Sequence, residues 1–285
     1  MNFEILQKRA AVYTLFVAAF LLLSPVTGRA QRGGGGGRGG AGGRGGAGGR
    51  GGAGGRGGGG GGRGAGGKQN APIDLTGYWV AVISEDWELR MITPPKGQFT
   101  SLPLNAEGRR VGNAWDPAKD EAAGEQCKYY GAASIMRIPG RLHITWENDT
   151  TLRVDTDAGT QTRLFHFGPA APGAAGEPSW QGYSSAQWET GPGGGRGGAS
   201  SGGGLKVVTN NLRPGYFRRN GAPYGKDAIV TEYFDLNTLP NGDKWFTVTT
   251  KVEDPQYLSR YYLTTSDFKK VPDATGWNPT PCSAK

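Results

Sequence analysis

The sequence predicts a mainly β protein, either an antiparallel barrel or a sandwich, with one or two short helices. Three observations favour this fold class. Short runs rich in β-branched and aromatic residues recur along the chain, each bounded by Gly, Pro, Asn or Asp. Turn signatures separate several adjacent runs. Helical periodicity is weak, so closely spaced antiparallel strands are expected to build the fold.

The predicted strands follow one another at short intervals. Those over 151–155 and 160–167 flank the turn signature Asp157-Ala158-Gly159 and are expected to form a hairpin. Asn241-Gly242-Asp243 predicts a second hairpin in the same way. The full set of predicted strands is 77–84, 142–147, 151–155, 160–167, 183–189, 205–209, 229–235, 245–252 and 261–268.

A Gly-rich loop over 191–204 separates two of these strands. Loop-closure entropy grows slowly with length, so the loop is expected to be an expanded, flexible hairpin turn inside a single β domain over 71–285. Helical signals are confined to Asn105–Val111 and to Pro117–Gln126, which Asp116 precedes as an N-cap.

Residues 1–30 have the pattern of a secretory signal peptide. Lys8 and Arg9 give a positive start, and Ala11–Leu23 is an apolar core too short for a stable membrane span. Small residues up to Ala30 predict cleavage after that position. The mature protein is therefore expected to be secreted or periplasmic in a bacterium, with no transmembrane anchor after cleavage.

Residues 31–70 form a Gly/Arg-rich stretch with an arginine at every sixth position from Arg32 to Arg56. Such a composition cannot bury a core, so a disordered tether is expected. The whole chain has a net charge of +8, yet from residue 69 onward 22 Lys and Arg face 23 Asp and Glu. Because the folded part is near neutral, nucleic acid is not an expected partner. An acidic cell-surface polymer that binds the basic tail is an alternative, which would make the protein a cell-envelope interaction module.

The chain has two cysteines, Cys127 and Cys282. In an oxidising compartment, a disulfide between them is the natural expectation. Such a bond would tie the C-terminal segment to the middle of the domain.

Eight tryptophans are many for this length and suggest an aromatic interior. Strand alternation predicts an inward face that includes Trp79, Ile144, Trp146, Tyr233 and Val248. These rings would either pack as a core or line a cavity for a small apolar or aromatic ligand. The candidate ligand-binding residues are Trp79, Arg137, His143, Trp146 and His166.

No catalytic residue, metal site or cofactor is predicted. The chain has no nucleophile elbow, zinc-protease helix motif or dinucleotide fingerprint in its expected context. An alternative is a secreted hydrolase or metal-dependent enzyme that uses His143 and His166 with Glu147 or Asp155. It requires these side chains to meet within about 4–5 Å, because metal ligands or proton-transfer partners share one centre.

Two resemblances add to this interpretation. Gly77-Tyr78-Trp79 resembles the opening G-x-W strand of lipocalin-like barrels, in which the Trp closes one barrel end. The stretch from Asp74 to Cys282 resembles a group of uncharacterised secreted β-rich proteins from soil bacteria. The resemblance is carried by 75–79, Asp116-Pro117 with Cys127, 178–184 with 188–189, 219–224, 230–234 and 247–250 with 254–255. It implies a signal peptide and a β-rich fold, and it carries over no catalytic residue.

Overall fold

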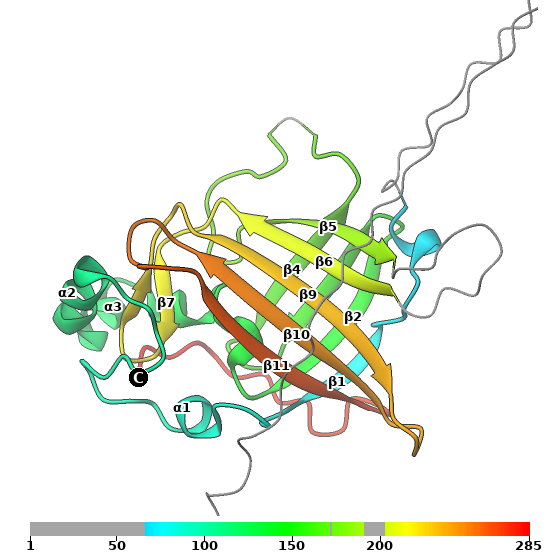
Figure 1. Cartoon of the computed structure of the whole chain (residues 1–285), viewed down its shortest axis with the longest axis horizontal. Coiled ribbons are helices and arrows are strands. Elements are labelled where there is room, and N and C mark those ends of the chain that lie inside the picture. Colours follow the sequence, from blue (N-terminus) through cyan, green and yellow to red (C-terminus); the bar gives the residue numbers. More distant parts are fainter. Residues whose placement is uncertain (1–65, 172, 191–202) are drawn as a thin grey trace, which may run out of the picture. The chain divides into compact units, whose positions relative to one another are not determined.

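The computed structural model describes residues 66–171, 173–190 and 203–285 (Figure 1). The predicted signal peptide, most of the predicted tether and most of the Gly-rich loop lie outside these residues. The last residues of the predicted tether are ordered: Lys68–Asn70 form a 3-10 turn (η1), and the Trp188 indole donates a hydrogen bond to the Gly67 carbonyl at 2.7 Å. None of the helices in these three ranges is long and apolar enough to cross a bilayer.

Nine strands close into a barrel, which confirms the predicted fold class and selects the barrel over the sandwich (Figure 1). Their neighbour order is β1-β11-β10-β9-β6-β5-β4-β3-β2. The strands are β1 (Gly77–Val82), β2 (Arg141–Asn148), β3 (Thr151–Thr156), β4 (Gln161–Phe167), β5 (Tyr183–Thr190), β6 (Gly203–Asn210), β9 (Ile229–Thr238), β10 (Lys244–Glu253) and β11 (Tyr262–Val271). A separate short hairpin pairs β7 (Gly215–Arg218) with β8 (Ala222–Tyr224).

The three predicted hairpins are confirmed as β3–β4, β5–β6 and β9–β10. One pair departs from a wholly antiparallel barrel, because β4 and β5 run parallel, with Phe165 opposite Ser184. Turn signatures predict only strands that are joined by a tight turn. The segment between β4 and β5 instead returns along the barrel, so that β5 pairs with β4 in parallel. The hairpin β7–β8 was also not predicted.

Three short helices accompany the barrel: α1 (Trp87–Met91), α2 (Ala106–Ala114) and α3 (Pro117–Ala122). The predicted N-cap is present, since the side chain of Asp116 accepts a hydrogen bond from the Ala118 amide at 3.1 Å. Asn105, which the sequence placed at the start of the first helical signal, caps α2 by accepting from the Gly108 amide at 2.8 Å. Helix α3 ends at Ala122, and the chain continues into the 3-10 turns η2 (Gln126–Tyr130) and η3 (Ile135–Arg137). Helix α1 was not predicted because five residues are too few to show a helical period.

Aromatic side chains fill the barrel interior. The ring of Phe246 contacts Trp79, Phe268 and Phe234, with ring centroids 4.6, 4.9 and 6.0 Å apart. All four side chains are at most 1% exposed. Rings packed at these distances fill the interior of the barrel. The predicted aromatic face therefore forms a core at these residues and does not line a ligand cavity there.

The predicted inward face is right for four of its five residues. Trp79, Ile144 and Val248 are buried in the core, and half-buried Trp146 packs against it. The prediction was wrong for Tyr233. Its neighbours Glu232 and Phe234 are the buried residues of β9, so alternation turns Tyr233 outward, where Lys206 lies over its ring.

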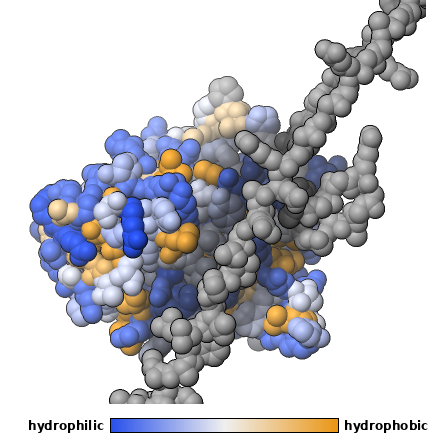
Figure 2. Space-filling view, viewed as in Figure 1, coloured by the Kyte–Doolittle hydropathy of each residue, from blue (hydrophilic) through white to orange (hydrophobic). Residues whose placement is uncertain are grey.

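Residues 83–140 and 211–228 cover one end of the barrel, and we call them the end cap. Figure 1 shows α1, α2, α3 and β7 gathered at this end. A second apolar cluster joins the cap to the strand ends; its largest members are Phe99, Phe217, Tyr224, Leu258 and Tyr262. The face in Figure 2 is mostly hydrophilic over the described residues, with scattered apolar spots.

Candidate functional site

The predicted disulfide between Cys127 and Cys282 is present, with the two Cα atoms 5.0 Å apart. It fixes the C-terminal segment 277–282, which we call the C-terminal strap, to turn η2. The strap is held further by two hydrogen bonds, from the Thr280 amide to the Asp157 carbonyl and from the Thr160 hydroxyl to the Thr280 carbonyl, both 2.9 Å. A segment anchored at Thr280 and Cys282 in this way can form the wall of a binding site.

A pocket of about 310 Å³ lies between the end cap, the barrel end and the C-terminal strap. We call it the arginine pocket, because Arg90, Arg218 and Arg219 line it. The lining also includes two tyrosine rings and several apolar side chains, among them Tyr129, Tyr130, Leu89, Met91, Ile138 and Pro139. The lining contains no aspartate or glutamate.

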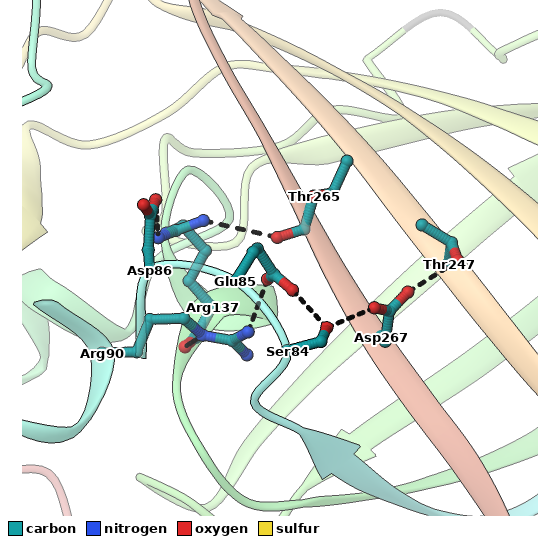
Figure 3. A network of polar contacts seen from close by, with 8 residues as sticks. All are labelled: Ser84, Glu85, Asp86, Arg90, Arg137, Thr247, Thr265 and Asp267. Carbon is teal, nitrogen blue, oxygen red and sulfur yellow. Dashed lines mark hydrogen bonds and ion pairs between the residues drawn. The ribbon is translucent and has the colours of Figure 1, made fainter. Parts of the chain in front are cut away.

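One side of the arginine pocket is braced by two ion pairs (Figure 3). Arg90 donates to the Glu85 carboxylate at 2.6 Å and to the backbone carbonyl of Arg137 at 2.9 Å. Arg137 in turn donates to the Asp86 carboxylate at 2.9 Å. Burial lowers the pKa of Arg90, and the neighbouring charge of Arg137 adds to this effect, while Glu85 opposes it. One nitrogen of Arg90, Nη2, is buried without a partner.

Two further arginines line the pocket, and Arg219 donates through Nη1 to the main-chain oxygen of Lys285 at 3.5 Å. Within the described residues, neither Arg218 nor Arg219 takes part in an ion pair. Arg218 is 5% exposed; its Nη1 donates to the Thr100 carbonyl at 2.6 Å, and its Nη2 is buried without a partner. A buried charge without a partner is costly, so an anion bound nearby would stabilise this arrangement.

The tyrosines place ring faces beside these charges. Arg219 donates to the Tyr130 hydroxyl at 2.9 Å, and its guanidinium lies 5.5 and 5.6 Å from the ring centres of Tyr129 and Tyr130. Burial raises the pKa of Tyr129, although the charges of Arg219, Arg137 and Arg90 act in the opposite direction. The phenol therefore stays neutral and serves as a ring surface and hydrogen-bonding group. The pocket has the chemistry of a binding site for an anion.

A second hollow of about 320 Å³ lies on the outer face of the barrel beside the C-terminal strap. We call it the tryptophan groove; its lining includes Tyr78, His143, Arg153, Asp155 and Trp277. The Tyr78 and His143 rings stack with centroids 4.1 Å apart and planes within 4°. This hollow contains one residue of the predicted site, His143.

The five predicted ligand-binding residues do not converge. Trp79 is buried in the barrel core, where its indole donates to the Leu75 carbonyl at 2.8 Å. Trp146 packs against Phe167 and Trp188 near the barrel wall. Arg137 braces the arginine pocket and His143 lines the tryptophan groove. The remaining residue, His166, is described separately below.

The two histidines lie far apart on the outer face. His143 is level with Asp155 on β3 and, one strand further, with Thr162 on β4. His166 lies four residues beyond Thr162, about 13 Å along the strand. It stacks on Tyr183 with ring centroids 5.0 Å apart. The geometry required for a shared metal or acid–base centre is therefore not met by these two side chains. Among the described residues, no group of three or more His, Cys, Asp or Glu is arranged to hold a metal ion.

Sequence reasoning missed most of the arginine pocket. Arg90 lies in the unpredicted helix α1, and Arg218 and Arg219 lie at the end of the unpredicted strand β7. Their stretches are separated by more than a hundred residues, so no local spacing could join them. The one available signal was the paired rings Tyr129-Tyr130 directly after Cys127, which the disulfide brings to the C-terminal strap.

The fold and the pocket define a closed β-barrel protein with a cationic, aromatic pocket at its capped end. Comparison with protein-family models, with curated proteins and with solved structures found no match to the chain. Its function is therefore inferred from the residues that line the two hollows.

Proposed function

We propose that this protein binds a small organic anion with an apolar or aromatic body in the arginine pocket. The observation that carries the proposal is the buried guanidinium of Arg218, which has no counter-charge among the described residues. Together with Arg219 and Arg90, the pocket offers two guanidinium groups that pair with no described aspartate or glutamate, and a third that Glu85 partly neutralises. Guanidinium groups favour carboxylates, phosphates and sulfates, which they bind through paired hydrogen bonds.

The lining also supports a ligand with an apolar body. Tyr129 and Tyr130 present rings, and Leu89, Met91 and Ile138 present aliphatic surface. A volume of about 310 Å³ is at the small end of ordinary ligand pockets, which run from about 300 to 1,000 Å³. An aromatic monocarboxylate has the size, charge and apolar surface that these groups match. The pocket thus replaces the barrel interior, which packed aromatic rings fill, as the place for an apolar or aromatic ligand.

Calorimetric titration tests the proposal. The purified protein is titrated with benzoate, phenylacetate and hexanoate, and with benzamide as the uncharged analogue. We expect the carboxylates to bind and the amide to bind at least tenfold more weakly, a difference of about 1.4 kcal/mol. Arg219→Gln should weaken carboxylate binding by a similar factor, whereas Arg109→Gln, an exposed arginine on α2, should not. Binding that ignores the ligand charge, or no binding by any carboxylate, would contradict the proposal.

Arg218→Met offers a second test with a different readout. The change removes a buried unpaired charge and keeps an apolar chain of similar length. The free energy of unfolding without ligand should stay within about 1 kcal/mol of the wild type or rise, since replacing an uncompensated buried charge is often favourable. Carboxylate binding should be lost in the same variant. A folded Arg218→Met protein that binds carboxylates normally would overturn the role of Arg218.

We further propose that the protein is exported, as the signal-peptide pattern, the disulfide and the resemblance to secreted proteins of soil bacteria each support. When the full chain is expressed in a bacterium, the protein recovered from the periplasm or medium should begin at Gln31. A full-length protein that stays in the cytoplasm would contradict export. Binding of the basic tail to an acidic cell-surface polymer remains a prediction: removing 31–65 should reduce surface association at low salt.

A further inference from the structure

We infer that the tryptophan groove is a second binding site, which takes the ring of a neutral saccharide. The groove lies on the outer wall of the barrel, whereas the arginine pocket lies at the capped end, and the C-terminal strap supplies residues to both. The inference stands on its own geometry and does not rest on the anion-binding proposal.

The floor of the groove is a single row of side chains across four strands. Tyr78 on β1 is directly opposite His143 on β2, and His143 is directly opposite Asp155 on β3. Asp155 is opposite Thr162 on β4. Side chains in such register stand side by side on one face of a sheet. The row therefore places the stacked rings of Tyr78 and His143, which cover one face of each other, next to a carboxylate and a hydroxyl.

Trp277 from the C-terminal strap forms the wall above this floor. Its ring is inclined 71° to Tyr78 and 73° to His143, with centroid distances of 6.0 and 6.3 Å. The indole plane is therefore steeply inclined to the two parallel ring planes. The Trp277 indole can contact the apolar C–H face of a saccharide ring held beside this pair.

The polar end of the floor is ionised and held in place. Arg153 donates through Nε to the Asp155 carboxylate at 2.8 Å, and the Thr162 hydroxyl donates to the same carboxylate at 2.5 Å. Partial burial raises the pKa of Asp155, but the hydrogen bonds from Arg153 and Thr162 and the charges of Arg153 and His143 outweigh it, and the net shift is downward. The fixed carboxylate can accept from one sugar hydroxyl, and the guanidinium beside it can donate to the next.

The groove is fixed before any ligand arrives. Two hydrogen bonds, from the Thr280 amide and from the Thr160 hydroxyl, hold the strap against the turn between β3 and β4. The disulfide at Cys282 holds it against η2. Preorganisation of this kind lowers the entropic cost of binding. Since Arg153 and Asp155 offset one another, the groove is near neutral, which favours an uncharged hydroxylated ring over an anion.

Trp277→Ala in the full-chain protein provides the test, with Trp87→Ala as the matched control. Both indoles lie at the surface, and Trp87 is 61% exposed on helix α1, which does not line the groove. Oligosaccharides of glucose, N-acetylglucosamine, galactose and mannose are titrated, and binding is followed by isothermal titration calorimetry, which needs no tryptophan signal. We expect at least one to bind, with about a tenfold loss in Trp277→Ala and no loss in Trp87→Ala.

A second variant keeps the test independent of aromatic packing. Asp155→Asn preserves size but removes the ionised acceptor and its pairing with Arg153, so saccharide affinity should fall while benzoate binding at the arginine pocket stays unchanged. If no oligosaccharide of the panel binds, or if Trp277→Ala binds as well as the wild type, the inference is overturned. A wild-type protein that binds a saccharide but does not bind benzoate would contradict only the anion proposal.

Discussion

Arg163 and Glu232 form a two-point ion pair inside the barrel, with contacts of 2.8 and 2.6 Å and no exposed side-chain surface on either residue. The pair joins β4 to β9 across the interior. The Thr209 hydroxyl accepts a further hydrogen bond from Arg163 at 3.2 Å, and Thr209 and Ser184 share a hydrogen bond at 2.7 Å. This polar network sits beside the single parallel pair of strands, β4 and β5, to which Arg163 and Ser184 belong.

Breaking this ion pair from one side should be more harmful than removing both partners. Arg163→Met leaves the Glu232 carboxylate buried without a partner and should lower the free energy of unfolding by about 3–5 kcal/mol. The double variant Arg163→Met, Glu232→Met should recover most of this loss. Urea unfolding of the wild type, both single variants and the double variant measures the coupling. If the free energy of unfolding of the double variant falls by the sum of the two single-variant decreases, the expected coupling is contradicted.

The disulfide between Cys127 and Cys282 should stabilise the fold and order the C-terminal strap. Replacing both residues with serine releases a loop of 155 residues and should cost about 2–5 kcal/mol. Saccharide binding should weaken with it, since Trp277 lies on the released strap. Thermal unfolding with and without a reductant checks the first point. Reductant should destabilise the wild type and leave the double-serine variant unaffected; equal responses would contradict the prediction.

His166 should make the stability of the protein depend on pH near neutrality. Burial lowers the pKa of His166 below its ordinary value, so the unfolded chain binds the proton more tightly than the folded chain. The stability that is linked to the neutral His166 imidazole is fully present above the unfolded pKa of about 6.5 and is lost as the pH falls below that value. His166→Gln should therefore show a smaller loss of stability between about pH 7.5 and 5.5. Identical pH profiles of the wild type and this variant would speak against the shift.

The turn residue Gly159 should be intolerant of a side chain, because it combines a left-handed backbone with close contact to the arginine pocket. Its φ is +75°, and an added Cβ would lie 2.2 Å from the Tyr130 ring. Gly159→Ala should cost more than about 2 kcal/mol and should weaken carboxylate binding by displacing Tyr130. Gly242→Ala is the control, since its φ is +86° and nothing lies within 4 Å of the new Cβ.

The control should cost only the left-handed backbone penalty of about 1–2 kcal/mol and leave binding intact. Chemical denaturation gives the two stabilities, and titration with benzoate gives the two affinities. If the two alanine variants behave alike in both measurements, the contact between Gly159 and Tyr130 does not support the pocket.

Much of the strand pattern was predictable, whereas most of the site was not. The turn signatures at 157–159 and 241–243 predicted hairpins correctly, because a tight turn and its two strands are neighbours in sequence. Alternation failed at Tyr233, because the charged Glu232 faces the interior and makes the polarity pattern of β9 favour the wrong phase. His143 was predicted as a site residue, but its partners Tyr78 and Trp277 were not, because strand register and the C-terminal strap bring them together.

The sequence by itself determined the fold class, the strand pairs joined by tight turns, the helix cap at Asp116 and the pairing of its two cysteines. These depend on local backbone preferences, on side-chain alternation, or on there being only one way to pair two thiols. Only the tertiary structure decided that the barrel closes through a parallel pair and that aromatic rings fill its axis. It also decided that Arg90, Arg218 and Arg219 line one pocket. Such contacts join residues far apart in the chain, and their positions follow from closure of the barrel and packing of the cap, which local sequence does not encode.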